Sequence, residues 1–215
     1  MKVPIYLSGA IRKELETIDG VGYMRTPFIS NKVNPDIIWF ADTGCYSIKG
    51  EKEFNLEKYL HWLTQQNKET CIAATAPDKV GDALETLKRS EPVLPLIRKL
   101  GYNAAFVAQD GLEILEIPWN TFDVLFIGGT TEWKLSKHAK KLTYDAKRRG
   151  KLVHMGRVNS FKRFLYAMRI GCDSVDGTLL CFGPSVHLPR LINWIKRLKI
   201  IETNYNKFIQ YNFQD

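Results

Sequence analysis

Six segments of this 215-residue chain share one pattern, in which a short apolar, β-branched run is followed directly by Asp, Gln, Gly, Thr or His. Residues 37–41 lead into Asp-Thr-Gly at 42–44, and residues 104–108 lead into Gln-Asp-Gly at 109–111. Continuous apolar runs are typical of strands covered on both faces in a parallel sheet. Polar residues at the carboxyl ends of such strands are where α/β enzymes carry their chemistry. The pattern therefore predicts an α/β fold with one site at the strand ends.

Strands and helices are expected to alternate along the chain. The expected strands are 4–8, 37–42, 70–76, 103–109, 122–128, 151–156 and 172–177, with an eighth at 179–182. Helical periodicity predicts helices over 55–63, in pieces over 78–100, and over 135–149, 160–170 and 187–199. Alternation implies parallel pairing with right-handed crossovers, hence a barrel or a doubly wound sheet. Because the chain is short for an α/β barrel, we predict a reduced TIM-like (β/α)8 barrel in a single domain spanning 1–215.

Two segments fit this plan poorly. Residues 9–36 contain Gly20, Gly22, Pro27 and Pro35 with little periodicity, so we expect an irregular loop excursion between the first two strands. Residues 200–215 are polar and aromatic, which indicates a C-terminal tail, either docked or frayed.

Charge points to a polyanionic partner. The chain has 31 Lys and Arg against 23 Asp and Glu, a formal net charge of +8, which favours nucleic acid. Arg148 and Arg149 lie in its most basic cluster and are candidate nucleic-acid contacts, although a basic last turn also stabilises a helix end. The four cysteines form no C-x-x-C pair, so no metal or other cofactor is expected. No run approaches membrane-spanning length, which predicts a cytoplasmic protein without a membrane partner.

Four of the strand-end clusters resemble the motifs of one family. Asp-Thr-Gly-Cys-Tyr-Ser at 42–47 resembles D-S-G-G-[FY]-Q, and Gln-Asp-Gly at 109–111 resembles V-Q-G-G. Ile-Gly-Gly-Thr at 127–130 resembles I-G-G-L, and Gly-Cys-Asp-Ser-Val-Asp at 171–176 resembles G-x-D-x-F-D. These motifs belong to the queuine/archaeosine tRNA-guanine transglycosylase family. Within it, the chain most resembles the compact members that act on DNA in 7-deazaguanine modification systems of phages and bacteria.

The resemblance implies roles for individual residues. It makes Asp176 the nucleophile and Asp42 the group for acid–base exchange, and it places Gln109, Gly128 and Gly129 against the base. The C-x-C-x-x-C zinc motif of the tRNA-acting enzymes is absent from the sequence, so DNA is favoured over tRNA as the polymer. The small-molecule substrate would be a preQ0-like 7-deazaguanine, and a phage-encoded protein would work in the host cytoplasm. A homodimer and accessory proteins both stay open as partners.

The residue types suit this chemistry on their own. Replacing a base with retention at the sugar needs two inversions, so a carboxylate should attack C1′ and later be displaced, a task that suits Asp176. Expelling guanine leaves negative charge on the base, and Asp42 could supply the proton. The alternatives are an Asp-Gly turn at Asp176 and an Asx turn at Asp42. Two carboxylates at an apolar barrel mouth would push their pKa values apart.

Base recognition needs an acceptor for the guanine N1–H and N2–H and donors for O6. Asp78, Gln109 and the Gly129 amide could provide them, although Asp78 is equally suited to cap the helix that follows. At the sixth strand end, Arg157 could contact a phosphate or the sugar, and His154 is a second substrate-binding candidate. A lone His after apolar residues is more often a packing residue.

Three aromatic residues could stack on a flipped base or on its neighbours, although most aromatic side chains belong to a core; they are Tyr46, Trp119 and Trp133.

Three other functions are compatible with these residues. The first is the same guanine exchange on tRNA, and the second is a non-catalytic nucleic-acid-binding subunit of such an enzyme. The third is a nucleobase hydrolase in which water completes the reaction. If phosphate contacts dominate binding, charge reversal at Arg148 and Arg149 should flatten the salt dependence of nucleic-acid affinity.

Overall fold

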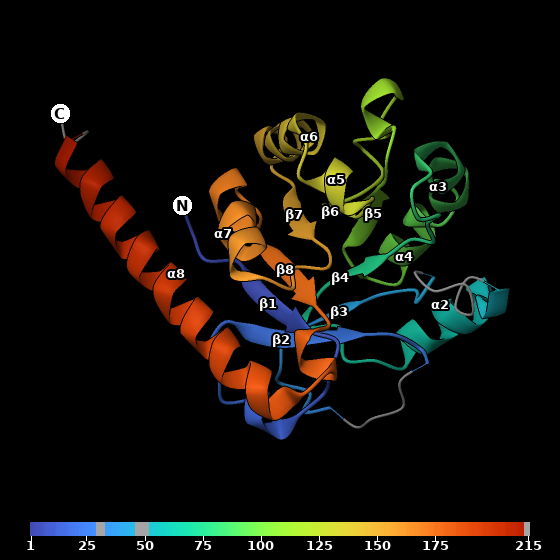
Figure 1. The fold of residues 1–215 in the computed structure, drawn as a ribbon. Coiled ribbons are helices and arrows are strands. Elements are labelled where there is room, and N and C mark those ends of the chain that lie inside the picture. Colours follow the sequence, from blue (N-terminus) through green and yellow to red (C-terminus); the bar gives the residue numbers. More distant parts are fainter. Residues whose placement is uncertain (29–32, 46–51, 213–215) are drawn as a thin grey trace.

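The computed structural model describes residues 1–28, 33–45 and 52–212, and in it eight parallel strands close into a barrel in chain order (Figure 1). The strands are β1 (Ile5–Ser8), β2 (Val21–Arg25), β3 (Trp39–Ala41), β4 (Cys71–Thr75), β5 (Ala104–Ala108), β6 (Val124–Ile127), β7 (Leu152–Met155) and β8 (Ser174–Gly177). Strand β8 pairs with β1 and completes the closure. The predicted single-domain TIM-like (β/α)8 barrel is confirmed.

In the described residues, α-helices connect β3 to β4, β4 to β5, β6 to β7 and β7 to β8, and a last one follows β8. They are α2 (Leu56–Thr64), α3 (Ala83–Ser90), α4 (Leu94–Lys99), α5 (Thr131–Lys134), α6 (Lys137–Arg148), α7 (Phe161–Ile170) and α8 (Pro184–Asn212). Three short 3₁₀ helices are η1 (Lys13–Leu15), η2 (Leu112–Ile114) and η3 (Leu179–Cys181). Side-chain caps begin α2, α3, α6 and α7, where Asn55, Asp82, Ser136 and Ser160 accept backbone N–H groups. The helices expected in these regions are present.

The eighth strand lies in a different place from the one expected. The prediction of an irregular loop excursion over 9–36 is wrong for Val21–Arg25, which form β2 between β1 and β3. The strand expected at 179–182 is wrong, because Leu179–Cys181 form the 3₁₀ helix η3. The apolar run at 179–182 instead places Leu180 in the core. Since β1 already pairs with β8, the barrel has no free edge at which 179–182 could add a strand.

The C-terminal segment is helical instead of a tail. Helix α8 continues without a break to Asn212, since neither Gly nor Pro follows Pro189 within it. Its first half packs on the barrel through Leu191 and Leu198, whereas Ile200 and Ile209 are exposed. Figure 1 shows α8 extending past the barrel towards the C terminus. The tail expected over 200–215 is therefore wrong up to residue 212.

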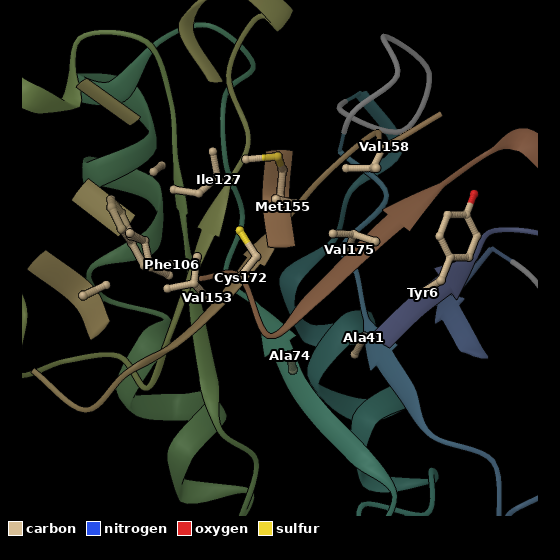
Figure 2. Packing of buried hydrophobic residues seen from close by; sticks show 14 of the residues in the cluster. Tyr6, Ala41, Ala74, Phe106, Ile127, Val153, Met155, Val158, Cys172 and Val175 are labelled. Carbon is tan, nitrogen blue, oxygen red and sulfur yellow. The ribbon is translucent and has the colours of Figure 1, made fainter. Parts of the chain in front are cut away.

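Strand residues alternate between two apolar layers. One fills the barrel interior and consists of Leu7, Phe40, Ala73, Ala105, Val107, Val124 and Phe126. The other lies between strands and helices and includes Tyr6, Phe106, Val153, Met155 and Val175 (Figure 2). Because Val153 and Met155 face the helices, the side chain of His154 between them faces the interior. In the described ranges, no helix combines the length and the apolar character needed to cross a membrane.

Candidate active site

The carboxyl ends of the strands surround a pocket of about 290 Å³. Its polar lining comes from β8 itself and from the loops after β3 to β8: Asp42, Asp78, Gln109, Gly128, Gly129, Gly156, Arg157, Asn159, Asp176 and Thr178. Met24, Val80, Val107 and Phe126 supply the apolar walls. The barrel thus brings together most of the residues that the sequence singled out, although they come from six different strand ends.

Asp176 is held at both carboxylate oxygens. His154 Nε2 lies 3.0 Å from Oδ2, and the backbone N–H of Arg157 donates to Oδ1 at 3.1 Å. Arg157 has a φ of +60°, in the left-handed region, and its guanidinium donates to the carbonyl of Gly129. The Asp176 side chain remains 14% exposed, towards the pocket. Because Asp176 and Gly177 both belong to β8, the Asp-Gly turn considered as an alternative is wrong.

Asp42 follows β3 directly and accepts the Gly44 N–H at 2.7 Å, so the Asx turn considered for it does form. The turn leaves the second carboxylate oxygen for other partners. Burial of the carboxyl group, followed by the negative charges of Asp78 and Asp176, raises the pKa of Asp42 to about 7. A carboxyl group with such a pKa exchanges a proton readily near neutral pH.

Gln109 joins three of the loops and is only 2% exposed. Its Oε1 accepts the N–H of Gly81 at 3.0 Å and that of Gly129 at 2.9 Å, and its Nε2 donates to Asp78 Oδ2 at 2.6 Å. The Gly129 amide, expected to face the base, therefore points at Gln109 instead. Helix α3 is capped by Asp82, so Asp78 does not cap it and its carboxylate lines the pocket.

Glycine at 129 is required by space as well as by backbone conformation. Its φ is +64°, and a Cβ there would lie 2.5 Å from the Trp133 ring and 2.8 Å from Asp110 Oδ2. At Gly128 a Cβ would lie 2.8 Å from Val107 Cγ1. The Asp110 carboxylate accepts both the N–H and the hydroxyl of Thr130, which fixes this loop to the one after β5.

The proposed stacking aromatics are placed elsewhere. Trp133 is buried and donates through Nε1 to Glu113 at 2.9 Å. Trp119 packs on Phe122, with its ring centroid 5.5 Å away. Trp133 belongs to the core, Trp119 is partly buried against it, and Tyr46 lies outside the described residues.

Three predicted contacts are not part of the pocket. His154 is completely buried beneath Asp176, so its assignment as a substrate-binding residue is wrong. Arg148 and Arg149 end α6, next to the start of β7. Because helices of a (β/α)8 barrel run antiparallel to its strands, this is the amino-terminal end of the barrel, opposite the pocket. Arg149 covers the Trp119 ring there, with its guanidinium 4.6 Å from the ring centroid.

Two residues near the site were missed by sequence reasoning. Ser174 lies two residues before Asp176 on β8, so strand alternation alone puts both on the same face. Lys134 is fully buried and donates to the Gly156 carbonyl at 2.5 Å. Burial, followed by the positive charge of Arg157, lowers the pKa of Lys134 to about 7. No sequence signal marks a lysine in a short helix as buried.

Among the described residues, no cluster of three or more His, Cys, Asp or Glu could hold a metal ion.

Comparisons with known proteins add little to this geometry. No protein-family model matches the sequence, and no curated protein matches it. A solved structure of the Bacillus subtilis YkuI protein, with an EAL domain and in complex with substrate c-di-GMP and calcium, is similar at 15% sequence identity and a TM-score of 0.45. The match covers 84% of this chain and 48% of that chain, so the present chain spans about half of that protein.

Proposed function

We propose that this protein is a base-exchange enzyme that replaces guanine in DNA with a preQ0-like 7-deazaguanine through a covalent aspartyl-sugar intermediate. The observation that carries the proposal is that Asp42 and Asp176, far apart in sequence, line one pocket beside the pair Asp78–Gln109. One carboxylate is held by two donors, whereas the other has a pKa of about 7. These are the properties that a nucleophile and a proton carrier need.

The size of the pocket limits the substrate. About 290 Å³ is at the lower end of the range of small-molecule sites, roughly 300–1,000 Å³. Such a pocket suits a purine with its sugar and is too small for a base pair within a duplex. The target nucleotide therefore has to leave the stack before it reaches Asp176.

In the first displacement, an oxygen of the Asp176 carboxylate forms a bond to C1′ of the nucleotide. The bond between C1′ and N9 breaks, and its electron pair leaves with the guanine. Protonated Asp42 gives its proton to the departing base, which leaves as neutral guanine. The Asp42 pKa of about 7 allows a substantial protonated fraction of this carboxyl group at neutral pH.

In the second displacement, the 7-deazaguanine occupies the position that guanine has left. The Asp42 carboxylate removes the proton from N9 of the incoming base, and N9 attacks C1′. The bond between C1′ and Asp176 breaks, and the carboxylate is restored. Two inversions retain the configuration at C1′, and Asp42 ends protonated as it began.

Asp78 is the proposed reader of the base. Its carboxylate can accept hydrogen bonds from N1–H and N2–H, groups that guanine and 7-deazaguanine share. Gln109 holds it through the 2.6 Å hydrogen bond to Oδ2. A base without these donors would leave hydrogen bonds to the Asp78 carboxylate unmade in the pocket, which costs about 1–3 kcal/mol.

The test is incorporation of labelled guanine. Purified protein is incubated with the label and duplex DNA, single-stranded DNA or tRNA, and label in the polymer is measured. We expect label in DNA, no label with Asp176→Asn, and full activity with the control Asp173→Asn, whose carboxylate pairs with Lys147 at the opposite end of β8. Label only in tRNA would favour the tRNA exchange. Free guanine with abasic DNA and no incorporation would favour the hydrolase, and no reaction on any polymer would contradict the enzyme proposal.

A further inference from the structure

A chain of hydrogen bonds crosses the interior of the barrel below Asp176. Ser174 Oγ lies 2.8 Å from His154 Nδ1, and His154 Nε2 lies 3.0 Å from Asp176 Oδ2. The chain links β8 to β7 and returns to β8, since His154 pairs in register with Ser174. Both His154 and Ser174 are buried, so neither contacts a ligand in the pocket.

Two aromatic rings fix the imidazole of His154. The Phe126 ring centroid lies 4.3 Å from that of His154, and the Phe40 centroid lies 4.8 Å away. All three side chains belong to the packed interior, where rotation of the imidazole would require these rings to move. The ring nitrogens therefore keep their partners, one at each side.

The partners determine which nitrogen carries hydrogen. An ionised carboxylate only accepts hydrogen bonds, so His154 Nε2 has to be the donor to Asp176. In a neutral imidazole Nδ1 is then the acceptor, and the Ser174 hydroxyl is its donor. Ser174 also borders a cavity of about 430 Å³ at the amino-terminal end of the barrel, which leaves space beside its side chain.

We propose that Ser174 and His154 are positioning residues for the nucleophile: the Ser174 hydroxyl donates to Nδ1 and so supports the Nε2–H tautomer that the Asp176 carboxylate requires, and His154 in turn holds Asp176 in place and stabilises it as the leaving carboxylate of the second displacement. The leaving-group part of this inference rests on the proposed function. The tautomer part depends only on the hydrogen bonds. The proton on Nε2 stays on His154 in both displacements, so no further acid or base is needed.

The amount of the covalent intermediate should depend on the hydrogen bond from His154 to Asp176. A hydrogen bond to an ionised carboxylate is about twice as strong as one between neutral groups. The bond from His154 therefore favours the free carboxylate over the ester that Asp176 forms with the sugar. Without it, breakdown of the ester slows and the ester accumulates.

The first experiment determines the tautomer by ¹⁵N NMR of histidine-labelled protein. The chain has four His residues, and the signals of His154 are those lost in His154→Phe. We expect a protonated Nε2 and an unprotonated Nδ1 in the wild type. Ser174→Ala should shift the Nδ1 signal, because that nitrogen loses its donor, whereas Ser174→Thr, which keeps the hydroxyl, should leave both signals unchanged. A protonated Nδ1 in the wild type, or an unchanged Nδ1 signal in Ser174→Ala, would overturn the inference.

The second experiment measures guanine exchange and the denaturation-resistant protein–DNA adduct together. His154→Phe keeps an aromatic ring between Phe40 and Phe126 but donates no hydrogen bond. We expect kcat to fall by about 100-fold with little change in KM for the base, the scale of losing one preorganised donor. The adduct fraction should rise by about tenfold, because the lost bond is charge-assisted.

Equal losses of exchange and adduct in His154→Phe would show a merely structural role and overturn the leaving-group part. Ser174→Ala offers the same comparison with a smaller change in packing, and Ser174→Thr should behave as wild type. A wild-type protein that forms no adduct would instead contradict the proposed function, while the NMR spectrum would still decide the tautomer.

Discussion

Asp42 shows how a single position combines a structural and a chemical property. Its Oδ1 closes a turn by accepting the Gly44 N–H, and its burial near Asp78 and Asp176 raises its pKa to about 7. The turn fixes the carboxyl group where two other negative charges act on it. The raised pKa of Asp42 makes the stability of the folded protein depend on pH.

Replacing Asp42 by Asn should stabilise the protein at high pH. The folded-state pKa of about 7 lies above the ordinary value of 3.8, so the folded protein holds more protons than the unfolded chain between these values. Stability of the wild type therefore falls as pH rises from about 4 to 7. Asn keeps the acceptor for Gly44 and carries no charge. Urea unfolding should show a gain of at most about 4 kcal/mol above pH 7 that disappears below pH 4. A gain of equal size at both pH values would contradict the raised pKa.

Gly129→Ala should destabilise the protein more than a matched glycine substitution. Gly150 has a φ of +70° with nothing within 4 Å of its Cβ position, so Gly150→Ala carries backbone strain alone, about 1–2 kcal/mol. Gly129→Ala adds the overlap with Trp133 and Asp110, worth about 1–3 kcal/mol more. It should also weaken binding of guanine, since the loop that meets Gln109 has to shift. Chemical unfolding and a guanine-binding titration measure the two effects. Equal destabilisation by both substitutions would contradict the packing argument.

At the residue scale, the sequence predicted where the site residues lie better than it predicted which way their polar groups point. Asp42, Gln109 and Asp176 could be predicted at the pocket because a strand end fixes where a residue lies. The direction of each group depends on its partners in space, which is why the Gly129 amide and His154 were misplaced. For His154, the alternation along β7 could have predicted a side chain that faces the barrel interior, since both of its neighbours are apolar and face the helices.

At the scale of elements, strands with continuous apolar runs were predictable and β2 was not. Val21–Arg25 contain Gly22, whose backbone lies so close to β3 that a Cβ would be 2.3 Å from the Ile38 carbonyl oxygen. That close approach requires glycine, which in sequence reads as a break in the strand. Residues 179–182 show the reverse error, because an apolar run indicates burial without specifying a strand.

Helix α8 should contribute to stability through its first half only. Leu198 is fully buried on the barrel, whereas Ile209 is 37% exposed. Leu198→Ala should lower the free energy of unfolding by about 2–5 kcal/mol through the cavity it leaves. The control Ile209→Ala should cost less than about 1 kcal/mol. Urea denaturation of the two variants measures the difference, and a large loss at Ile209 would mean that the projecting half is packed in solution.

At the scale of the whole molecule, the two ends of the barrel have different chemistry. The pocket opens at the carboxyl end, while Arg148 and Arg149 lie at the amino end. Lys137 and Lys162 are exposed near the starts of α6 and α7, on the side of the pocket. A polynucleotide whose flipped base reaches Asp176 would pass these two lysines.

Salt dependence should therefore separate the two faces. Charge reversal at Lys137 and Lys162 should reduce the slope of log affinity against log salt by about one per lost phosphate contact. The double variant Arg148→Glu and Arg149→Glu should leave the slope unchanged, in contrast to the expectation from sequence alone. Fluorescence anisotropy with labelled single-stranded DNA between low and moderate salt measures both. The opposite ranking would place the polymer at the amino end.

The rings of Phe40, His154 and Phe126 form an aromatic layer beneath Asp176. It blocks solvent from the underside of Asp176, so a water molecule that attacks a sugar ester there has to arrive through the same opening as the base. In the proposed exchange, a bound purine also closes this opening, so hydrolysis of the sugar ester to an abasic site is confined to the interval between departure of one base and arrival of the next.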